Sequence, residues 1–249
     1  MKEVMKGMKI ASATHKGVVR ATNQDAYGAG ELPGGVIYAV VCDGMGGANG
    51  GNIASELSVK TIVDQINASY RMGMSSNSVR RMIETAVNAA NIVVFDMANA
   101  NETLAGMGTT VVCAVLNCNT AHISHAGDSR AYLIREGKIL QITKDHSVVQ
   151  SMLENGQLTP DEARFHPRKN VITRALGVSE SIEVDYDEIE MEPDDILLLC
   201  TDGLTNFVDT EEILSISSSV PLYELPDALI NAANRSGGGD NITVVTIAL

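Results

Sequence analysis

The strongest structural signal in this 249-residue chain is the apolar run at residues 36–42 (VIYAVVC), which leads directly into residues 43–47 (DGMGG). Valine, isoleucine and tyrosine favour extended backbone, and an unbroken apolar run of this length is typical of a strand buried on both faces. A strand that ends in Asp-Gly delivers a carboxylate at the edge of a sheet, while the glycine permits a sharp turn. We therefore predict a strand over residues 35–42, with Asp43 at its end.

Further runs rich in valine and isoleucine predict strands at 109–116, 120–125, 130–135, 182–189, 196–200 and 242–249. Several of them follow one another with short gaps, which favours antiparallel meanders over a regular alternation of strands and helices. Apolar residues spaced by three and four predict a long helix that starts at Ser78 as N-cap and reaches Met97. Shorter helices are predicted at 54–66, 211–217 and 224–235, so the predicted fold class is α+β.

The stretch 144–177 departs from this pattern, because the strand signal stops and polar helical pieces take its place. Within it, Thr159-Pro160-Asp161-Glu162 forms a capping-box signature at the start of a helix. We interpret 144–177 as an excursion over the body of the protein, a flap. The sequence as a whole predicts a single domain over 8–249, with an N-terminal extension at 1–7 before it. Met1, Met5 and Met8 are alternative start residues.

The charge balance excludes several classes of partner. The chain carries 18 Lys and Arg against 31 Asp and Glu, a formal net charge of −13, and its basic residues are scattered. Nucleic-acid and membrane-surface proteins need clustered cations, so neither partner is expected. No apolar run is long enough to span a bilayer, which predicts a cytoplasmic protein. The four cysteines form no C-x-x-C pair and are expected to be reduced, buried thiols.

Aspartate beside glycine recurs at the ends of the apolar runs, at Asp43, Asp128, Asp202 and Asp240. If these corners meet, the acidic cluster needs a neutralising cation. Mg²⁺ or Mn²⁺ is the usual choice for an all-oxygen ligand set, and Ca²⁺ is less suited to catalysis. The alternative is that Asp-Gly is ordinary turn chemistry and that the corners never meet. Arg20 precedes Asp25 closely and offers a guanidinium suited to bidentate capture of phosphate.

Seven motifs in this order resemble those of the bacterial metal-dependent (PPM, type 2C) protein serine/threonine phosphatase family, from about residue 10 to the end of the chain. They are 14–25 (THKGVVRATNQD), 43–47 (DGMGG), 108–110 (GTT), 127–130 (GDSR), 145–147 (DHS), 201–206 (TDGLTN) and 239–243 (GDNIT). The resemblance implies a four-layer α-β-β-α sandwich with two central antiparallel sheets, and it makes 144–177 the flap subdomain of that family.

The same resemblance implies a binuclear Mn²⁺ or Mg²⁺ centre at one end of the sandwich. It makes Asp43 the bridge between the two ions, gives one ion the carbonyl of Gly44, and assigns Asp202 and Asp240 to the other. A third ion would be held by Asp128 together with Asp202.

The resemblance also implies the reaction, in which a water that bridges the two ions attacks phosphoserine or phosphothreonine directly. Arg20 would bind the phosphoryl oxygens and Asp25 would act through metal-bound water. The implied partners are phosphoproteins, including a bacterial serine/threonine kinase and its targets, and the protein is expected to be a monomer.

The sequence departs from the family pattern in three places. His15 stands where an aspartate is usual, Ala48 replaces a histidine that commonly follows the glycine pair, and Met45 replaces a histidine proposed as general acid in eukaryotic members. The proton donor therefore stays open between metal-bound water, His15 and His146.

Two other functions deserve comparison with this one. Gly44, Gly46 and Gly50 after a buried strand superficially mimic a dinucleotide fingerprint, but Asn49 occupies the last glycine position. A catalytically silent phosphatase-like sensor or binding module is the other alternative. Such proteins generally lose metal-binding aspartates, and all of them are present in this sequence.

Overall fold

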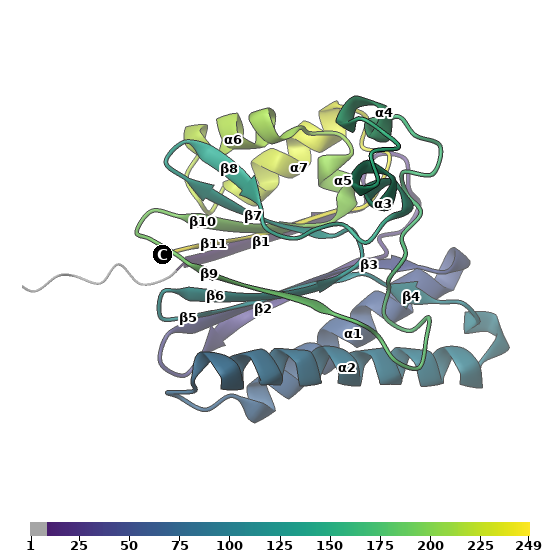
Figure 1. Ribbon diagram of the computed structural model, residues 1–249, viewed down its shortest axis with the longest axis horizontal. Helices are drawn as coiled ribbons and strands as arrows, with labels where there is room; N and C mark the ends of the chain where they lie inside the picture. The colour runs from purple at the N-terminus through teal and green to yellow at the C-terminus, as the bar shows by residue number, and fades with distance from the viewer. Residues whose placement is uncertain (1–8) are drawn as a thin grey trace, which may run out of the picture.

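Two antiparallel sheets lie face to face at the centre of the computed structural model, which describes residues 9–249, and helices cover both outer faces (Figure 1). The predicted extension at 1–7 lies outside the described residues. The first sheet has the order β1 (Lys9–His15), β11 (Ile242–Ala248), β10 (Ile196–Cys200), β7 (Arg130–Arg135) and β8 (Lys138–Gln141). The second has the order β2 (Asp25–Leu32), β3 (Val36–Met45), β5 (Val111–Asn117), β6 (Thr120–Ala126) and β9 (Asp185–Glu190), and β4 (Gly108–Thr109) pairs with β3.

The helices divide between the two outer faces, so that the molecule has four layers, α-β-β-α, as expected. Below the second sheet in Figure 1 lie α1 (Gly47–Ser69) and α2 (Ser76–Ala100), followed by the short η1 (Glu102–Leu104). The first sheet is covered by α5 (Asp202–Thr205), α6 (Thr210–Ser219) and α7 (Leu225–Arg235). This antiparallel architecture excludes the dinucleotide-binding alternative, which requires a parallel βαβ unit.

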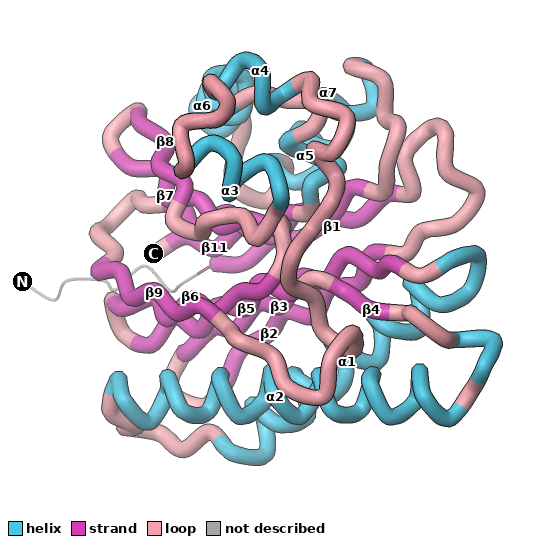
Figure 2. The backbone as a smooth tube through the Cα atoms, turned by 45° about the vertical axis from the view of Figure 1, so that its right-hand side comes forward, coloured by secondary structure: helices cyan, strands magenta, loops and turns pink. Residues whose placement is uncertain are grey.

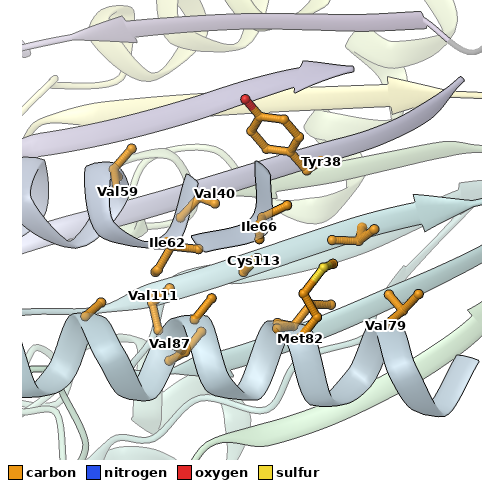
Figure 3. Packing of buried hydrophobic residues seen from close by; sticks show 14 of the residues in the cluster. Tyr38, Val40, Val59, Ile62, Ile66, Val79, Met82, Val87, Val111 and Cys113 are labelled. Carbon is orange, nitrogen blue, oxygen red and sulfur yellow. The ribbon is translucent and has the colours of Figure 1, made fainter. Parts of the chain in front are cut away.

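Strand β3 shows why its sequence is an unbroken apolar run. Tyr38 and Val40 point toward the helical layer, whereas Ile37, Ala39 and Val41 point toward the opposite sheet, and all five side chains are buried. Figure 3 shows the helical side of this packing, with side chains of α1 and α2 meeting those of the sheet. Because both faces of β3 are covered, neither face can carry polar residues, and the strand becomes the centre of the sandwich.

Strand β2 was not predicted, and its glycines explain why. A side chain at Gly28 would come within 3 Å of the Val59 and Val63 side chains of α1, and one at Gly30 would collide with the ring of Tyr38. The close approach of a helix and an aromatic ring therefore requires glycine where strand propensity expects a branched residue. Strands β1 and β8 were also missed, and the strand predicted at 182–189 begins only at Asp185.

Two further predictions were wrong in detail. The long helix begins at Ser76, and its N-cap is Ser75, whose hydroxyl accepts from the Ser78 amide, so Ser78 lies inside the first turn. Cys42, Cys113 and Cys200 are buried as expected, but Cys118 is exposed at the turn between β5 and β6. That turn requires a positive φ at Cys118, which places its side chain at the tip of the hairpin.

The stretch 144–177, which we call the flap, carries α3 (Val148–Glu154) and α4 (Pro160–Arg164). Thr159 and Glu162 form the predicted capping box at the start of α4. Both helices lie beside α5 at the same end of the sandwich (Figures 1 and 2). Among the described helices, none combines the length and the apolar character that a crossing of the bilayer demands.

The N-cap of α2 can be tested by replacing Ser75 and Ser78, one at a time, with alanine. Ser75→Ala should lower the free energy of unfolding by about 1 kcal/mol, because it removes the acceptor for an orphan amide. Ser78→Ala is the matched control and should cost less, since alanine is the better helix former inside the first turn. Urea unfolding of both variants measures the difference, and an equal or larger loss for Ser78→Ala would contradict the assignment.

Candidate active site

Five aspartates from distant parts of the sequence meet at one end of the sandwich. Asp25 starts β2, Asp43 lies near the end of β3, and Asp202 follows β10 as the first residue of α5. Asp128 lies in the turn between β6 and β7, and Asp240 precedes β11. Within each sheet, antiparallel pairing places the end of one strand next to the start of its neighbour, and the packing of the two sheets brings the positions of both together.

A cavity of about 540 Å³ opens over this cluster. It is lined by Asp43, Asp128, Asp202 and Asp240, by Arg20 and by residues of the flap. Asp25 does not line the cavity and lies beneath it, with 8% of its surface exposed. The alternative that the Asp-Gly corners never meet is therefore wrong, because four of the carboxylates share one cavity above the fifth.

Two of these like charges, Asp25 and Asp43, are direct cross-strand partners in the register of β2 and β3. Like charges opposite each other on a sheet are destabilising. The backbone of Asp43 is held firmly nevertheless: its amide donates to the Thr110 hydroxyl at 3.0 Å, and its carbonyl accepts from the Thr109 hydroxyl at 2.7 Å. The Gly108-Thr109-Thr110 motif thus fixes the end of β3 in place.

One oxygen of Asp25 is fully engaged and the other is not. Oδ2 accepts from the hydroxyl of Thr243 at 2.7 Å and from that of Thr201 at 2.9 Å. The Thr14 hydroxyl lies 2.7 Å from that of Thr243 and accepts from the Asn23 amide at 2.9 Å. Because Thr243 donates to Asp25, it must accept from Thr14, so the protons of this chain all point toward the carboxylate. Oδ1 is buried without a hydrogen-bond partner.

Burial and mutual repulsion raise the pKa values of this cluster. Burial raises the pKa of Asp25 to about 7, with Asp202 and Asp240 adding to the rise and the two threonines opposing it. Burial, reinforced by Asp202 and Asp145, raises the pKa of Asp128 to about 8. The pKa of Asp43 is raised well above its usual value by burial and by Asp25.

The same arrangement fits a divalent cation. The pKa of Asp202 is raised by burial and by Asp240, and its Oδ1 is buried without a hydrogen-bond partner although Asn206 donates to Oδ2 at 2.9 Å. Unpartnered buried carboxylate oxygens are costly unless a cation or a donor completes them. An all-oxygen donor set with several negative charges matches the preference of Mg²⁺ and Mn²⁺.

Gly44 must be a glycine because the start of α1 approaches it closely. A side chain at Gly44 would overlap the carbonyl oxygen of Gly51 and lie 2.6 Å from that of Gln24. The Gly44 amide donates to the Gln24 carbonyl at 3.1 Å, and Gly44 itself lines the cavity. The glycine thereby keeps the backbone at the end of β3 exposed to the acidic cluster.

Arg20 lies at the rim of the cavity and is paired with one of the carboxylates. Its Nη2 lies 2.8 Å from Oδ2 of Asp240, and its Nε donates to the Gly239 carbonyl at 3.3 Å. Asn241 orders the loop that carries Arg20, since its side chain donates to the carbonyls of Lys16 and Thr22 at 2.9 Å each. Half of the Arg20 side chain is exposed, so the guanidinium is within reach of a ligand that enters the cavity.

The two histidines considered as proton donors, His15 and His146, are not among the described residues that line the cavity. His15 is exposed, and its Nδ1 accepts from the amide of Gly17 at 3.0 Å. His146 is buried at the start of the flap, where its Nδ1 accepts from the amide of Gly127 at 3.2 Å. Neither ring therefore reaches the acidic cluster in this conformation.

A second group of potential metal ligands, His125, His146 and Asp185, lies at the base of the flap. The two imidazole rings are stacked with an angle of 4° between their planes, so one ion cannot lie in the plane of both. Arg174 already supplies a cation here, with its Nη1 2.6 Å from Oδ1 of Asp185. His146 and Arg174 come from the two ends of the flap, so this cluster is a clamp that ties both ends to β9.

Sequence reasoning missed the residues that orient the carboxylates. Thr201 and Thr243 belong to quoted motifs, and their positions directly before Asp202 and shortly after Asp240 were a usable signal. The pairing of Arg20 with Asp240 and the contact of Asn206 with Asp202 depend on loop geometry and carry no signature in the sequence.

Comparison with known proteins gives a consistent result. A family model described as protein phosphatase 2C matches residues 14–234. The protein phosphatase PhpP of Streptococcus pneumoniae is 37% identical over 244 residues, which are 97% of this chain and 98% of that protein.

Solved structures extend the likeness to three dimensions. Serine/threonine phosphatase Stp1 from Staphylococcus aureus superposes with a TM-score of 0.92 at 31% identity, over 97% of this chain and 95% of that chain. The catalytic domain of serine/threonine protein phosphatase PstP, in complex with two manganese ions, has a TM-score of 0.85 at 33% identity, over 97% of both chains. With a family match over most of its length and relatives above 30% identity along nearly all of it, the chain belongs to the protein phosphatase 2C family.

Proposed function

We propose that this protein hydrolyses phosphoserine and phosphothreonine in other proteins with the help of Mn²⁺ or Mg²⁺. The observation that carries the proposal is the cavity in which four carboxylates and Arg20 meet above the buried Asp25. No neutral or anionic ligand suits so many carboxylates, whereas divalent ions and a phosphoryl group together balance their charge. The manganese ions in the related PstP structure support the same choice of cation.

The structure suggests which residues would hold the ions. Besides burial, the other four carboxylates all help to raise the pKa of Asp43. Asp43 would bridge two ions, with the Gly44 carbonyl on one and with Asp202 and Asp240 on the other. Asp128 together with Asp202 would hold a third. The chemistry that such ions supply is Lewis acidity toward water and phosphoryl oxygens.

The protein's own side chains would perform three tasks. Arg20 would exchange its contact with Asp240 for a bidentate contact with two phosphoryl oxygens, where its planar guanidinium fits the geometry. Asp25, with Oδ2 held by two threonines and Oδ1 unpartnered, would orient a water and accept a proton from it. The cysteines nearest the site, Cys42 and Cys200, are buried and are therefore not placed as nucleophiles.

We further propose a single catalytic domain over 8–249 with the flap as its subdomain, and phosphoprotein substrates that include the targets of a bacterial serine/threonine kinase. The competing function, a catalytically silent sensor, has no observation in its favour, because the full set of carboxylates converges. The direct test is an assay of metal-replete protein on a phosphothreonine peptide and on p-nitrophenyl phosphate. Hydrolysis that disappears with a chelator supports the proposal, and the absence of hydrolysis of both substrates contradicts it.

The first prediction concerns the carboxylates themselves. Asp43→Asn and Asp240→Asn should each lower kcat/KM by more than about a hundredfold with saturating Mn²⁺, because each removes a ligand charge. Both variants should keep the circular dichroism spectrum of the parent, since they relieve repulsion rather than remove packing. Asp96→Asn, an exposed position on α2, is the matched control. Near-parental activity in either site variant would refute the ligand assignment.

The second prediction concerns the hydroxyls that hold Asp25. Thr243→Val keeps the shape of the side chain but removes its donor to Oδ2, and should lower kcat/KM about tenfold or more. Thr243→Ser, which keeps the hydroxyl donor, should retain most of the parental kcat/KM. Thr246→Val, a buried position on the same strand whose hydroxyl donates to the Ala11 carbonyl, is the control. Mn²⁺ affinity measured by calorimetry should follow the same order, and equal behaviour of the two valine variants would count against the role of Thr243.

The third prediction concerns pH. The pKa values of Asp25 and Asp128 are about 7 and about 8 in the folded protein without metal, against about 3.9 for an unfolded aspartate. The folded state therefore binds more protons than the unfolded state between about pH 4 and pH 8, and the stability of metal-free protein should fall as the pH rises through this window. Urea unfolding in the presence of a chelator measures the fall, which should exceed about 2 kcal/mol.

Two controls accompany this measurement. Asp25→Asn should flatten the pH dependence, and saturating Mn²⁺ should remove it, because ligated carboxylates stay ionised. Metal-free stability that is constant or rises between about pH 5 and pH 8 would mean that the carboxylates are not held together as the structure places them.

A further inference from the structure

A second cavity, of about 420 Å³, lies between the flap and the helices α5 and α6, and the chemistry described above does not use it. We call it the flap cavity. Its wall includes the apolar side chains of Val149 and Leu153 from α3 and of Val208 after α5. Two cations, Arg164 at the end of α4 and Lys169, stand in the same wall. The cavity therefore combines an apolar surface with positive charge.

The flap cavity adjoins the active site. Lys169 lines the flap cavity, and the next residue, Asn170, lines the catalytic cavity. The Nζ of Lys169 donates to Oδ1 of Asn206 at 3.3 Å, and Nδ2 of Asn206 donates to Oδ2 of Asp202 at 2.9 Å. Two hydrogen bonds thus separate a cation of the flap cavity from the acidic cluster. An extended peptide advances about 3.3 Å per residue, so a side chain within a few residues of the reacting one can enter this cavity.

The charges in the wall favour an anion. Arg130 and Asp145 neutralise each other through bonds of 2.8 and 2.7 Å, and Asp209 caps α6 by accepting from the amide of Glu212. Neither Arg164 nor Lys169 forms an ion pair with any residue of the described chain. Two cations without a carboxylate partner therefore stand together in the wall of this cavity.

We propose that the flap cavity binds an acidic side chain of the phosphoprotein substrate, a few residues away from the phosphorylated one. This proposal rests on the proposed phosphatase function. Arg164 and Lys169 bind the carboxylate, and Val149, Leu153 and Val208 contact its methylene groups. The flap thereby selects substrates whose phosphorylated residue lies in an acidic sequence, while the catalytic cavity alone handles the phosphoryl group.

The test is a set of phosphothreonine peptides with alanine at every flanking position, compared with peptides that carry one glutamate at each position in turn. Glutamate at one position should raise kcat/KM about fivefold through the new ion pair, and raising the ionic strength should reduce that gain. A glutamine peptide at the same position controls for shape, and a phosphoserine peptide there distinguishes a carboxylate site from a general anion site. A larger gain with phosphoserine than with glutamate would overturn the choice of carboxylate.

Variants of the protein locate the preference. Arg164→Gln and Lys169→Gln, singly and together, should abolish the gain from glutamate while leaving kcat/KM for p-nitrophenyl phosphate within about twofold of the parent. Arg168→Gln is the matched control. It removes the same charge from the same flap, but Arg168 lines neither cavity. The gain should survive in that variant.

Three further outcomes would overturn the proposal. They are an active parent without any preference for glutamate, a preference that persists in the Arg164 and Lys169 double variant, and an equal loss on peptide and on p-nitrophenyl phosphate. A parent that hydrolyses neither substrate with Mn²⁺ refutes the proposed function itself, and the two failures are therefore distinguishable.

Discussion

The mutual repulsion of five aspartates at one end of the sandwich is the constraint on which the rest of the structure depends. The pairing of β2 with β3 in one sheet holds Asp25 and Asp43 opposite each other, although these carboxylates repel one another. Uncharged hydroxyl groups hold both residues: those of Thr201 and Thr243 donate to the Asp25 carboxylate, and those of Thr109 and Thr110 bind the Asp43 backbone. The apolar core provides the free energy that holds an unfavourable cluster together, and a divalent cation converts the repulsion into binding.

The layers of the fold could be predicted because a strand that is buried on both faces has an unbroken apolar run in its own sequence. Residues 36–42 of β3 and all of β10 are apolar, and this pattern can be recognised without any knowledge of the neighbouring strands. Strand β2 could not be predicted, because Gly28 and Gly30 are required by close contacts with side chains of α1 and with Tyr38, which are not adjacent to them in the sequence. The predicted N-cap of α2 was wrong by three residues for a related reason. Ser75 and Ser78 are equivalent N-cap candidates in the sequence, and only the folded backbone distinguishes them.

Four of the five carboxylates of the site could be recognised as Asp-Gly corners in the sequence, but the contacts among the five could not. The pairing of Arg20 with Asp240 and the burial of Asp25 beneath the cavity follow from the way two sheets and a loop meet. The clamp of His146, Asp185 and Arg174 is equally invisible in sequence, yet it decides where the flap lies. The position of the flap in turn creates a second cavity beside the first. Local pattern thus predicts which groups carry the chemistry, and tertiary packing decides how they are held and what they can select.

The central claim is that this cluster is assembled to receive divalent cations. Calorimetric titration of metal-free protein with Mn²⁺, at about pH 6.5 and in two buffers of different ionisation enthalpy, measures both binding and the protons exchanged. Because several of these carboxyl pKa values are raised, the account predicts that Mn²⁺ binds with release of protons from the protein. No Mn²⁺ binding, or binding with no proton release, would contradict it.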